Sequence, residues 1–249
     1  MKNYALIGRR LGHSFSQRYF ESLFRRLGLS DHRYTLVEME TLEGLREWVS
    51  RDGINGFNVT IPFKQTVIGL LDSLDAEAEA IGAVNCVVVE GGGRLVGHNT
   101  DCGAFRRSLR DLPSVRQALV LGTGGAARAV GYALKTAGIP LRYVSRTPEG
   151  HPMPWGDTVP YSLVASSELS PATLVVNATP VGMFPDVDSS PWPNAALFRT
   201  DSVVYDLVYN PSPTLLMRQA AQHGATVTDG SRMLHLQADM SWRLWQGLE

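Results

Sequence analysis

The chain has 249 residues, of which 44% are hydrophobic and 19% are charged, and its 23 basic residues nearly balance 24 acidic ones. At about 150 residues per domain, this length predicts one large domain or two small ones with enough apolar residues to fill a core. The net charge of -1 excludes the basic surface of a general nucleic-acid binder and provides no polybasic membrane anchor.

The cysteine and histidine content gives no sign of a metal site. Cys86 and Cys102 are too few and wrongly spaced for a disulfide framework or a cysteine-type zinc site, and the six histidines show no ligand spacing. The apolar run near the start is about four residues, far shorter than the core of a signal peptide. No stretch approaches the ~20 apolar residues of a membrane span. We therefore expect a cytoplasmic protein without a metal, a membrane or a nucleic acid as partner.

Strand and helix patterns alternate through the first hundred residues. Strands are predicted at residues 4–8, 32–39, 54–59, 83–89 and 95–98, and helices at 16–27, 42–49, 66–74 and 76–81. Three glycines at 91–93 predict a hairpin turn between the last two strands. This order predicts an α/β fold with a largely parallel sheet.

A second series of alternating elements begins after Asp101. Strands are predicted at residues 117–121, 141–144, 174–177, 202–207 and 226–227, and helices at 102–112, from the glycine-rich segment to about 137, 213–223 and 231–248. Residues 147–161 are rich in proline and glycine and are predicted to form a loop. The best domain boundary lies near residue 100, and the final helix could pack on either half.

Residues 122–127 match a dinucleotide-binding fingerprint, because Gly122, Gly124 and Ala127 follow a predicted strand and open a helix. Gly122 allows the tight turn, Gly124 lets the backbone approach a pyrophosphate, and Ala127 permits close helix–sheet packing. The helix N-terminus offers free N–H groups to the phosphates. The alternative is an ordinary glycine-rich turn between a strand and a helix.

The end of the next strand indicates which dinucleotide would bind. An Asp or Glu at this place would bind a free ribose 2′-hydroxyl, whereas an Arg accommodates a 2′-phosphate. The chain has Ser145, Arg146 and Thr147 here and no acidic residue. The guanidinium of Arg146 can bind a phosphate through two parallel hydrogen bonds, and the hydroxyls of its neighbours add donors. The sequence favours NADP(H) over NAD(H), with a plain surface arginine as the alternative.

Polar clusters mark the ends of strands in the first half. Ser14 and Ser16 could both donate hydrogen bonds to a carboxylate, although Ser16 could instead cap the following helix. Asn58 and Thr60 lie on one face of a strand because side chains alternate along it.

Two further residues of these clusters could exchange protons. Lys64 follows Pro62 in the turn after a strand, and a lysine among apolar neighbours can have a lowered pKa and act in proton transfer. A surface lysine is the alternative. Asn85 begins a strand, and Asp101 precedes a predicted helix, where capping is the simpler role. His98, within a strand, is interpreted as structural.

Taken in order, the motifs of this chain resemble those of the shikimate dehydrogenase family, the NADP-dependent enzymes of the aromatic amino-acid pathway. The motifs are HSFS at 13–16, NVTIPFK at 58–64, GAVN at 82–85, NTD at 99–101, GTGGA at 122–126, NATPVGM at 177–183, YDLVYNP at 205–211, and Gly230 with Met233, Leu234 and Gln237. Eight motifs in the right order span essentially the whole chain.

The resemblance implies a role for each matching residue. Lys64 and Asp101 would be the catalytic pair, and Ser14 and Ser16 would hold the substrate carboxylate. The other substrate contacts would be Asn58, Thr60, Asn85, Tyr209 and Gln237. The cofactor contacts would be Gly122, Thr123, Gly124, Gly125, Ala126 and Ala127 at the pyrophosphate, Ser145, Arg146 and Thr147 at the 2′-phosphate, and Ala178, Leu207 and Gly230 near the nicotinamide.

The family fold implies two α/β domains. Residues 1–100 would form a mostly parallel substrate-binding catalytic domain, residues 101–232 a Rossmann-like NADP-binding domain, and the helix at 233–249 would pack back on the first domain. The implied activity is the reversible reduction of 3-dehydroshikimate to shikimate by NADPH, with Lys64 as the proton donor and Asp101 orienting it. The protein would be a monomer or a homodimer with a small-molecule substrate.

The sequence departs from the family pattern at two places. The family often has Pro-x-x-His-Asn after the second serine, where this chain has Gln17-Arg18-Tyr19-Phe20. The family often has a second arginine four residues after the position of Arg146, where this chain has Gly150. Two alternatives therefore stay open: an NAD-preferring quinate/shikimate dehydrogenase, and a catalytically silent nucleotide-sensing protein.

Overall fold

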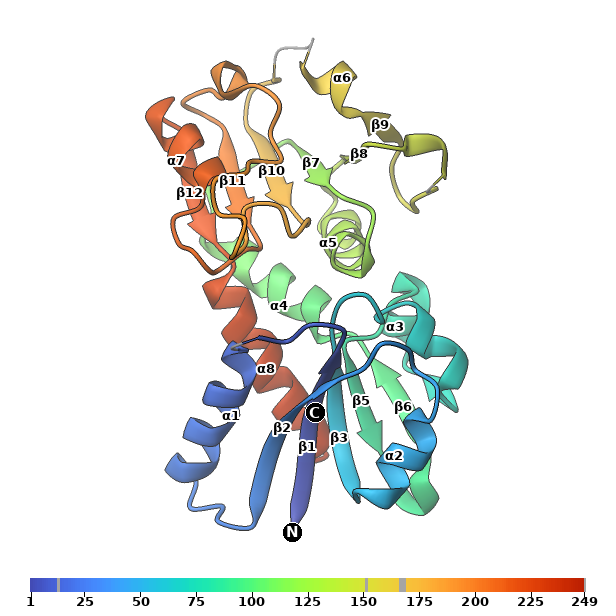
Figure 1. Cartoon of the computed structure of the whole chain (residues 1–249). Helices are drawn as coiled ribbons and strands as arrows, with labels where there is room; N and C mark the ends of the chain where they lie inside the picture. Colours follow the sequence, from blue (N-terminus) through green and yellow to red (C-terminus); the bar gives the residue numbers. More distant parts are fainter. Residues whose placement is uncertain (13, 151, 166–168, 249) are drawn as a thin grey trace. The chain divides into compact units, whose positions relative to one another are not determined.

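The computed structural model describes residues 1–12, 14–150, 152–165 and 169–248. The chain divides into two compact units, Met1–Asp101 with His235–Glu249 and Cys102–Leu234 (Figure 1). Each unit is built on a six-stranded sheet with helices, which confirms the predicted class of two α/β domains. His13 of the first motif and residue 151 of the predicted loop lie outside the described residues.

The first unit alternates strands and helices. Its elements are β1 (Lys2–Gly8), α1 (Phe15–Arg26), β2 (His32–Glu38), α2 (Leu45–Arg51), β3 (Ile54–Val59), β4 (Ser73–Leu74), α3 (Ala76–Ile81), β5 (Cys86–Val89) and β6 (Leu95–His98). The strand order is β2-β1-β3-β5-β6-β4, and β5 runs against both of its neighbours while the other pairings are parallel. The carboxyl ends of β1, β3 and β6 therefore lie along one edge of this sheet.

Both faces of the first sheet are covered, as the alternation of buried side chains along β1 shows. Ala5 and Ile7 pack in one apolar cluster with residues of α2, whereas Tyr4 and Leu6 pack in another with α1 and α8 (Ser231–Trp245). A strand with both faces buried has few polar residues. The last turns of α8 therefore complete the core of the first unit.

The contact between α8 and the sheet depends on a glycine. A Cβ atom at Gly56 of β3 would overlap the indole ring of Trp245, so this position admits no side chain while the indole keeps its place. The indole Nε1 donates to the carbonyl oxygen of Val87 at 3.0 Å, and the ring stacks on Tyr4 with centroids 4.7 Å apart. Trp245 thus anchors the C-terminal helix to the middle of the first sheet.

The second unit is an all-parallel sheet with helices. Its elements are α4 (Thr100–Ser108), which begins in the first unit, β7 (Gln117–Leu121), α5 (Gly125–Thr136), β8 (Leu141–Ser145), β9 (Thr158–Pro160), α6 (Tyr161–Ala165), β10 (Thr173–Asn177), β11 (Val203–Asp206), α7 (Leu215–Gln222) and β12 (Thr226–Asp229). The strand order is β12-β11-β10-β7-β8-β9. The order reverses between β7 and β10, and ligands of such sheets bind beyond the strand ends at this switch point.

Three predicted elements differ from the structure. The predicted helix at 66–74 is a short 3₁₀ turn at Thr66–Leu70 followed by β4, because Ser73 and Leu74 pair with β6 and that pairing overrides helical propensity. The predicted loop at 147–161 contains β9 and the start of α6, because residues 158–160 add an edge strand to β8.

The third difference concerns the helix predicted at 102–112. It begins earlier, at Thr100, and its α-helical part ends at Ser108, where a 3₁₀ turn takes over. The hydroxyl of Ser108 donates to the carbonyl oxygen of Phe105, a local hydrogen bond that competes with the helical pattern. Among the described residues, no helix is long and apolar enough to cross a membrane.

Candidate active site

Lys64 and Asp101 form an ion pair in the first unit. The Nζ of Lys64 donates to Oδ2 of Asp101 at 2.6 Å, and the two side chains are only 15% and 8% exposed. Lys64 follows β3, and Asp101 follows β6, which runs in the same direction. The sheet thus brings the two predicted catalytic residues into direct contact at the edge where these strands end.

Asn85 holds the Asp101 carboxylate in place. Its Nδ2 donates to Oδ1 of Asp101 and to Oγ1 of Thr100, each at 2.9 Å. Its Oδ1 accepts the backbone N–H of Thr100 at 2.7 Å. Since Asn85 is itself 3% exposed, both carboxylate oxygens have fixed partners, and the orientation of the carboxylate toward Lys64 is set before any ligand binds.

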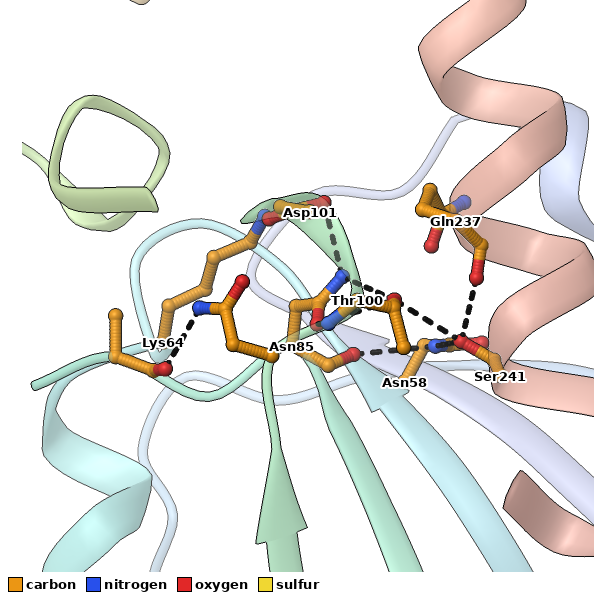
Figure 2. Close-up of polar contacts among 9 residues, drawn as sticks. Asn58, Lys64, Asn85, Thr100, Asp101, Gln237 and Ser241 are labelled. Carbon is orange, nitrogen blue, oxygen red and sulfur yellow. Dashed lines mark hydrogen bonds and ion pairs between the residues drawn. The ribbon is translucent and has the colours of Figure 1, made fainter. Parts of the chain in front are cut away.

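A chain of buried hydrogen bonds continues from Thr100 to α8 and β3 (Figure 2). The hydroxyls of Thr100 and Ser241 lie 3.3 Å apart, and Ser241 also accepts from Nδ2 of Asn58 at 2.8 Å. Oδ1 of Asn58 accepts the hydroxyl of Tyr34 at 2.9 Å. Burial raises the pKa of Tyr34 well above its ordinary value, so this hydroxyl keeps its proton and remains a donor.

The other predicted substrate residues of the first unit lie at the start of α1, after β3 and in α8. Ser14, not Ser16, caps α1, because its Oγ accepts the backbone N–H of Ser16 at 3.2 Å. Ser16 is buried in the first turn. Thr60 directly follows β3 and is half-buried, and no hydrogen bond joins its hydroxyl to the network in the described part of the chain. Gln237 is 9% exposed. Its main-chain carbonyl oxygen accepts the hydroxyl of Ser241 at 2.9 Å (Figure 2).

Tyr209 belongs to the second unit. It lies three residues beyond the end of β11 and is half-buried. The residues described above that connect to Lys64 and Asp101 by hydrogen bonds, Asn85, Thr100, Ser241 and Asn58, belong to the first unit.

Two corrections concern residues at helix starts. The sequence predicts that Asp101 directly precedes its helix, with capping as the alternative to a catalytic role, but Asp101 lies inside the first turn of α4. There the positive end of the helix dipole stabilises a carboxylate, so its side chain is left to bind Lys64 and Asn85. The alternative capping role of Ser16 is likewise wrong, since Ser14 occupies the cap position.

Sequence reasoning missed Thr100 and Ser241. Both are almost completely buried polar residues, with exposures of 1% and 0%, and buried polar groups require hydrogen-bond partners. A signal for Ser241 was present, because it lies four residues after Gln237 and therefore on the same face of the helix. Thr100 had no signal beyond its position beside Asp101.

His98 has a structural partner, in agreement with its interpretation from the sequence. Its Nδ1 lies 2.6 Å from Oδ2 of Asp75, and the other carboxylate oxygen of Asp75 caps α3 by accepting the N–H of Ala78. Burial alone would raise the pKa of Asp75, but the hydrogen bonds from His98 and Ala78 lower it below its ordinary value. The pair joins β6 to α3.

The glycine loop of the second unit has the geometry that a pyrophosphate requires. Gly122 has φ of +105°, and a Cβ atom there would approach Thr179 at 3.0 Å, so a larger residue would be strained. Gly124 is the N-cap of α5 and provides no side-chain cap, and the first turn contains no acidic residue. The free N–H groups and positive dipole of this turn are therefore available to an anion.

The end of β8 has the donors predicted for a 2′-phosphate. Arg146 and Thr147 are exposed, whereas Ser145 is 7% exposed and its Oγ accepts the N–H of Thr147 at 3.2 Å. Burial raises the pKa of Tyr161, and the positive charge of Arg146 offsets part of this rise. The guanidinium of an arginine at this place can bind a phosphate through two parallel hydrogen bonds. The residues of the loop and of this strand end therefore fit NADP.

The residues predicted to lie near the nicotinamide occupy the same edge of the sheet. Ala178, Leu207 and Gly230 each follow directly on the last residue of β10, β11 and β12. Ala178 donates its N–H to the carbonyl oxygen of Leu121, and Leu207 donates to that of Asn177, each at 3.0 Å. A Cβ atom at Gly230 would overlap the carbonyl oxygen of Leu207. The ends of four strands, including β7, are thus in register.

Within the described ranges, no group of three or more His, Cys, Asp or Glu residues is placed to hold a metal ion. The two units instead present two different kinds of site. The first unit provides neutral hydrogen-bonding groups around one ion pair, and the second provides backbone donors and an arginine. This division suits a small polar substrate and an anionic cofactor.

Comparison with known proteins supports this description. The family model described as "Shikimate dehydrogenase substrate binding domain" matches residues 6–87. The NADP(+)-dependent shikimate dehydrogenase of Methanopyrus kandleri is 39% identical over 98% of this chain and 90% of its own length.

Solved structures agree over the whole chain. The shikimate 5-dehydrogenase of Thermus thermophilus, in complex with NADP(H) and shikimate, has a TM-score of 0.85 and 36% identity, covering 100% of this chain and 94% of its own. The quinate dehydrogenase of Corynebacterium glutamicum, in complex with NAD, has a TM-score of 0.84 and 29% identity, covering 99% and 94%. With this identity over nearly its full length, the chain belongs to the shikimate dehydrogenase family of oxidoreductases.

Proposed function

We propose that the protein catalyses the reversible, NADPH-dependent reduction of 3-dehydroshikimate to shikimate in aromatic amino-acid biosynthesis. The observation that carries this proposal is the buried ion pair of Lys64 and Asp101, 2.6 Å apart and held by Asn85. Residues 1–101 with 235–249 act as the substrate-binding catalytic domain, and residues 102–234 act as the NADP-binding domain.

Substrate binding uses neutral donors and acceptors. The hydroxyls of Ser14 and Ser16, at the start of α1, bind the carboxylate of the substrate, where the helix dipole adds to their effect. The hydroxyl groups and the carbon ring of the substrate are bound by amide and hydroxyl side chains, which are those of Asn58, Thr60, Asn85, Tyr209 and Gln237. A site with buried partners for each hydroxyl discriminates against analogues that lack one, because those partners stay unpaired.

The proton step belongs to Lys64. When bound at Gly122–Ala127 and Ser145–Thr147, NADPH supplies the hydride that reduces the ketone. Lys64 stabilises the developing negative charge on the substrate oxygen and donates a proton to it. Asp101 accepts one N–H of the ammonium group, which orients the remaining N–H groups. In the reverse direction Lys64 accepts the hydroxyl proton of shikimate.

The experiment that tests the proposal follows the absorbance of reduced nicotinamide during oxidation of shikimate and of quinate, each with NADP⁺ and with NAD⁺. We expect turnover of shikimate with NADP⁺ and a much lower kcat/KM with NAD⁺. Equal use of both cofactors would remove the role of Arg146 as a 2′-phosphate donor. If none of the four assays shows turnover but the protein still binds the cofactor, the result would favour a nucleotide-sensing protein.

A second candidate is an NAD-preferring quinate/shikimate dehydrogenase. It is favoured by Gly150, which stands where the family often has a second arginine, and by the similarity to the quinate dehydrogenase of Corynebacterium glutamicum. It is opposed by Arg146 and by the lack of an acidic residue at the end of β8. Turnover of quinate with NAD⁺ in the same assay would establish it.

We further propose that the protein acts in the cytoplasm, as a monomer or a homodimer. Cys86 and Cys102 are both buried and form no disulfide in the described part of the chain, and burial raises the pKa of Cys86 to about 12. Cysteines without disulfides are usual in a reducing compartment. Cell fractionation and size-exclusion chromatography with light scattering test the location and the oligomeric state.

A further inference from the structure

The carboxylate of Asp206, the last residue of β11, is completely buried and joins three separate segments of the second unit. Its Oδ1 accepts from Nδ2 of Asn177 at 2.8 Å and from the N–H of Val208 at 3.0 Å. Its Oδ2 accepts the hydroxyl of Thr214 at 2.7 Å. Asp206, Asn177 and Thr214 are each 0% exposed. One side chain therefore fixes the end of β10, the segment after β11 and the start of α7.

The charge of Asp206 is compensated by neutral hydrogen-bond donors. No ion pair with a lysine, arginine or histidine is found for it in the described ranges, and its pKa is raised by burial, with a smaller contribution from the nearby Asp229. Such a carboxylate is costly unless several donors compensate for the lost water. Here three donors converge on the carboxylate, and removing it would leave these buried donors without an acceptor, so the arrangement of the three segments depends on Asp206.

Asn177 extends this arrangement into the next turn. Its Oδ1 accepts the N–H of Thr179 at 3.0 Å and its hydroxyl at 2.6 Å. Its Nδ2, besides donating to Asp206, donates to the carbonyl oxygen of Val181 at 3.2 Å. The turn that contains Ala178 is therefore tied to the same carboxylate through one side chain.

The residues held in this way adjoin the expected nicotinamide contacts. Ala178 follows Asn177. Leu207 lies between Asp206 and Val208, and the N–H of Val208 donates to the carboxylate of Asp206. Gly230 donates its N–H to the carbonyl oxygen of Val208 at 3.4 Å. We propose that Asp206, through Asn177, Val208 and Thr214, is the positioning residue that fixes the nicotinamide-binding segments of the second unit. This inference rests on the proposed function, because the nicotinamide contacts follow from it.

The proposal separates the two halves of the cofactor. Asp206 ends β11 and contacts Asn177 at the end of β10, whereas the adenosine half is expected at the glycine loop and at Ser145–Thr147, beyond β7 and β8. Loosening the Asp206 contacts should therefore weaken the binding of whole NADPH while leaving the binding of adenosine 2′,5′-bisphosphate intact. A general loss of structure would weaken both ligands together.

The test measures the dissociation constants of NADPH and of adenosine 2′,5′-bisphosphate by isothermal titration calorimetry on full-length variants. Asp206→Asn keeps the shape and removes the charge, and Thr214→Val removes one donor while keeping the carboxylate. Two variants serve as controls. Thr214→Ser restores that donor, and Asp201→Asn removes a carboxylate that lies before the start of β11 and is 43% exposed. Circular dichroism and thermal unfolding establish that each variant is folded.

For Asp206→Asn and Thr214→Val we expect NADPH to bind about ten-fold or more weakly, with the dissociation constant of the bisphosphate changed by less than about two-fold. Thr214→Ser and Asp201→Asn should bind both ligands as the unmodified protein does. Unchanged NADPH binding in Thr214→Val, or equal losses for both ligands, overturns the inference even if Asp206→Asn does not fold. If the unmodified protein binds neither ligand, the proposed function fails and the inference fails with it.

Discussion

At the scale of single residues, the position of Lys64 explains why this lysine is not replaced by an arginine in so arginine-rich a chain. Only three of the 23 basic residues are lysines. An ammonium group can release its proton when its surroundings change, whereas a guanidinium keeps its charge under all ordinary conditions. Lys64 must donate a proton when the ketone is reduced and accept one when the alcohol is oxidised, and an arginine could not do both.

This reasoning predicts the effect of Lys64→Ala. We expect kcat for shikimate oxidation to fall by about 10²-fold or more, since general acid–base catalysis and the charge that stabilises the substrate oxygen are lost together. The fold should persist, because the side chain is at the edge of the sheet. Steady-state kinetics with circular dichroism measures both. Lys135→Ala, on α5, serves as the matched control, and a near-normal kcat in Lys64→Ala would remove Lys64 from the mechanism.

Asp75 yields a prediction about pH and stability. Its pKa is lowered in the folded protein, against the effect of burial, by His98 and by the N–H of Ala78. A depressed carboxyl pKa contributes stability above the unfolded value of about 3.9, and that stability is lost as the pH falls through the folded value. Asp75→Asn should therefore reduce the free energy of unfolding at pH 7, by less than about 1 kcal/mol because the pair is partly exposed.

Urea unfolding at pH 7 and at pH 3 measures this difference. The gap between Asp75→Asn and the unmodified protein should be largest at pH 7 and should narrow at pH 3. The control is Glu79→Gln, which removes a carboxylate from an exposed position on the same helix. A gap that stayed constant with pH would show that the charge of Asp75 does not contribute.

At the scale of elements, Gly56 limits how α8 can pack on the first sheet. Gly56→Ala places a methyl group where the indole of Trp245 now lies. Overpacking of this kind costs about 1–3 kcal/mol. We expect a loss of this size in chemical denaturation. Gly69→Ala is the control, because a Cβ atom there meets nothing within 4 Å, and an equal loss in both variants would contradict the packing argument.

The sequence predicted elements well where the pattern was local and strong, and poorly where pairing with a distant strand decided the outcome. The glycine fingerprint and its flanking strand and helix are local, and β7 and α5 form as expected. The two residues of β4 and the three of β9 are strands only because β6 and β8 lie beside them. Such short edge strands carry no periodicity that a window of sequence could detect.

The candidate site shows the same limit. Lys64, Asn85 and Asp101 could be selected from the sequence because motifs surround them, and the structure brings them together. Ser241 was missed although it lies four residues after Gln237, because its partner Asn58 is 183 residues away in the chain and only the fold shows that the two meet. Asp206 and Asn177 lay within quoted motifs, but only the register between β10 and β11 shows that their side chains meet.

At the scale of the whole molecule, the two units differ in how the chain builds them. The second unit is one continuous stretch, whereas the first needs residues 235–249 in addition to its first 101 residues. We expect a fragment of residues 100–234 to fold alone and to bind adenosine 2′,5′-bisphosphate. Residues 1–101 alone should lack a cooperative unfolding transition, because Ala238, Ser241 and Trp245 are missing from the core and the polar network.

Thermal unfolding followed by circular dichroism tests both fragments, and calorimetry tests the binding. Adding a peptide of residues 231–248 to the first fragment is the matched control, and it should restore a cooperative transition. Cooperative unfolding of residues 1–101 without the peptide would contradict the assigned role of α8.

The anchoring of α8 by Trp245 also has a consequence for biosynthesis. During translation, residues 1–101 leave the ribosome first, but the helix that closes their apolar face is made only after the entire second unit. Until then, three aromatic side chains of that face, Tyr4, Phe20 and Tyr34, lack the indole that contacts them in the folded protein. At ~5–20 residues per second this interval lasts about 7 to 30 seconds, long enough for a chaperone to engage the exposed face.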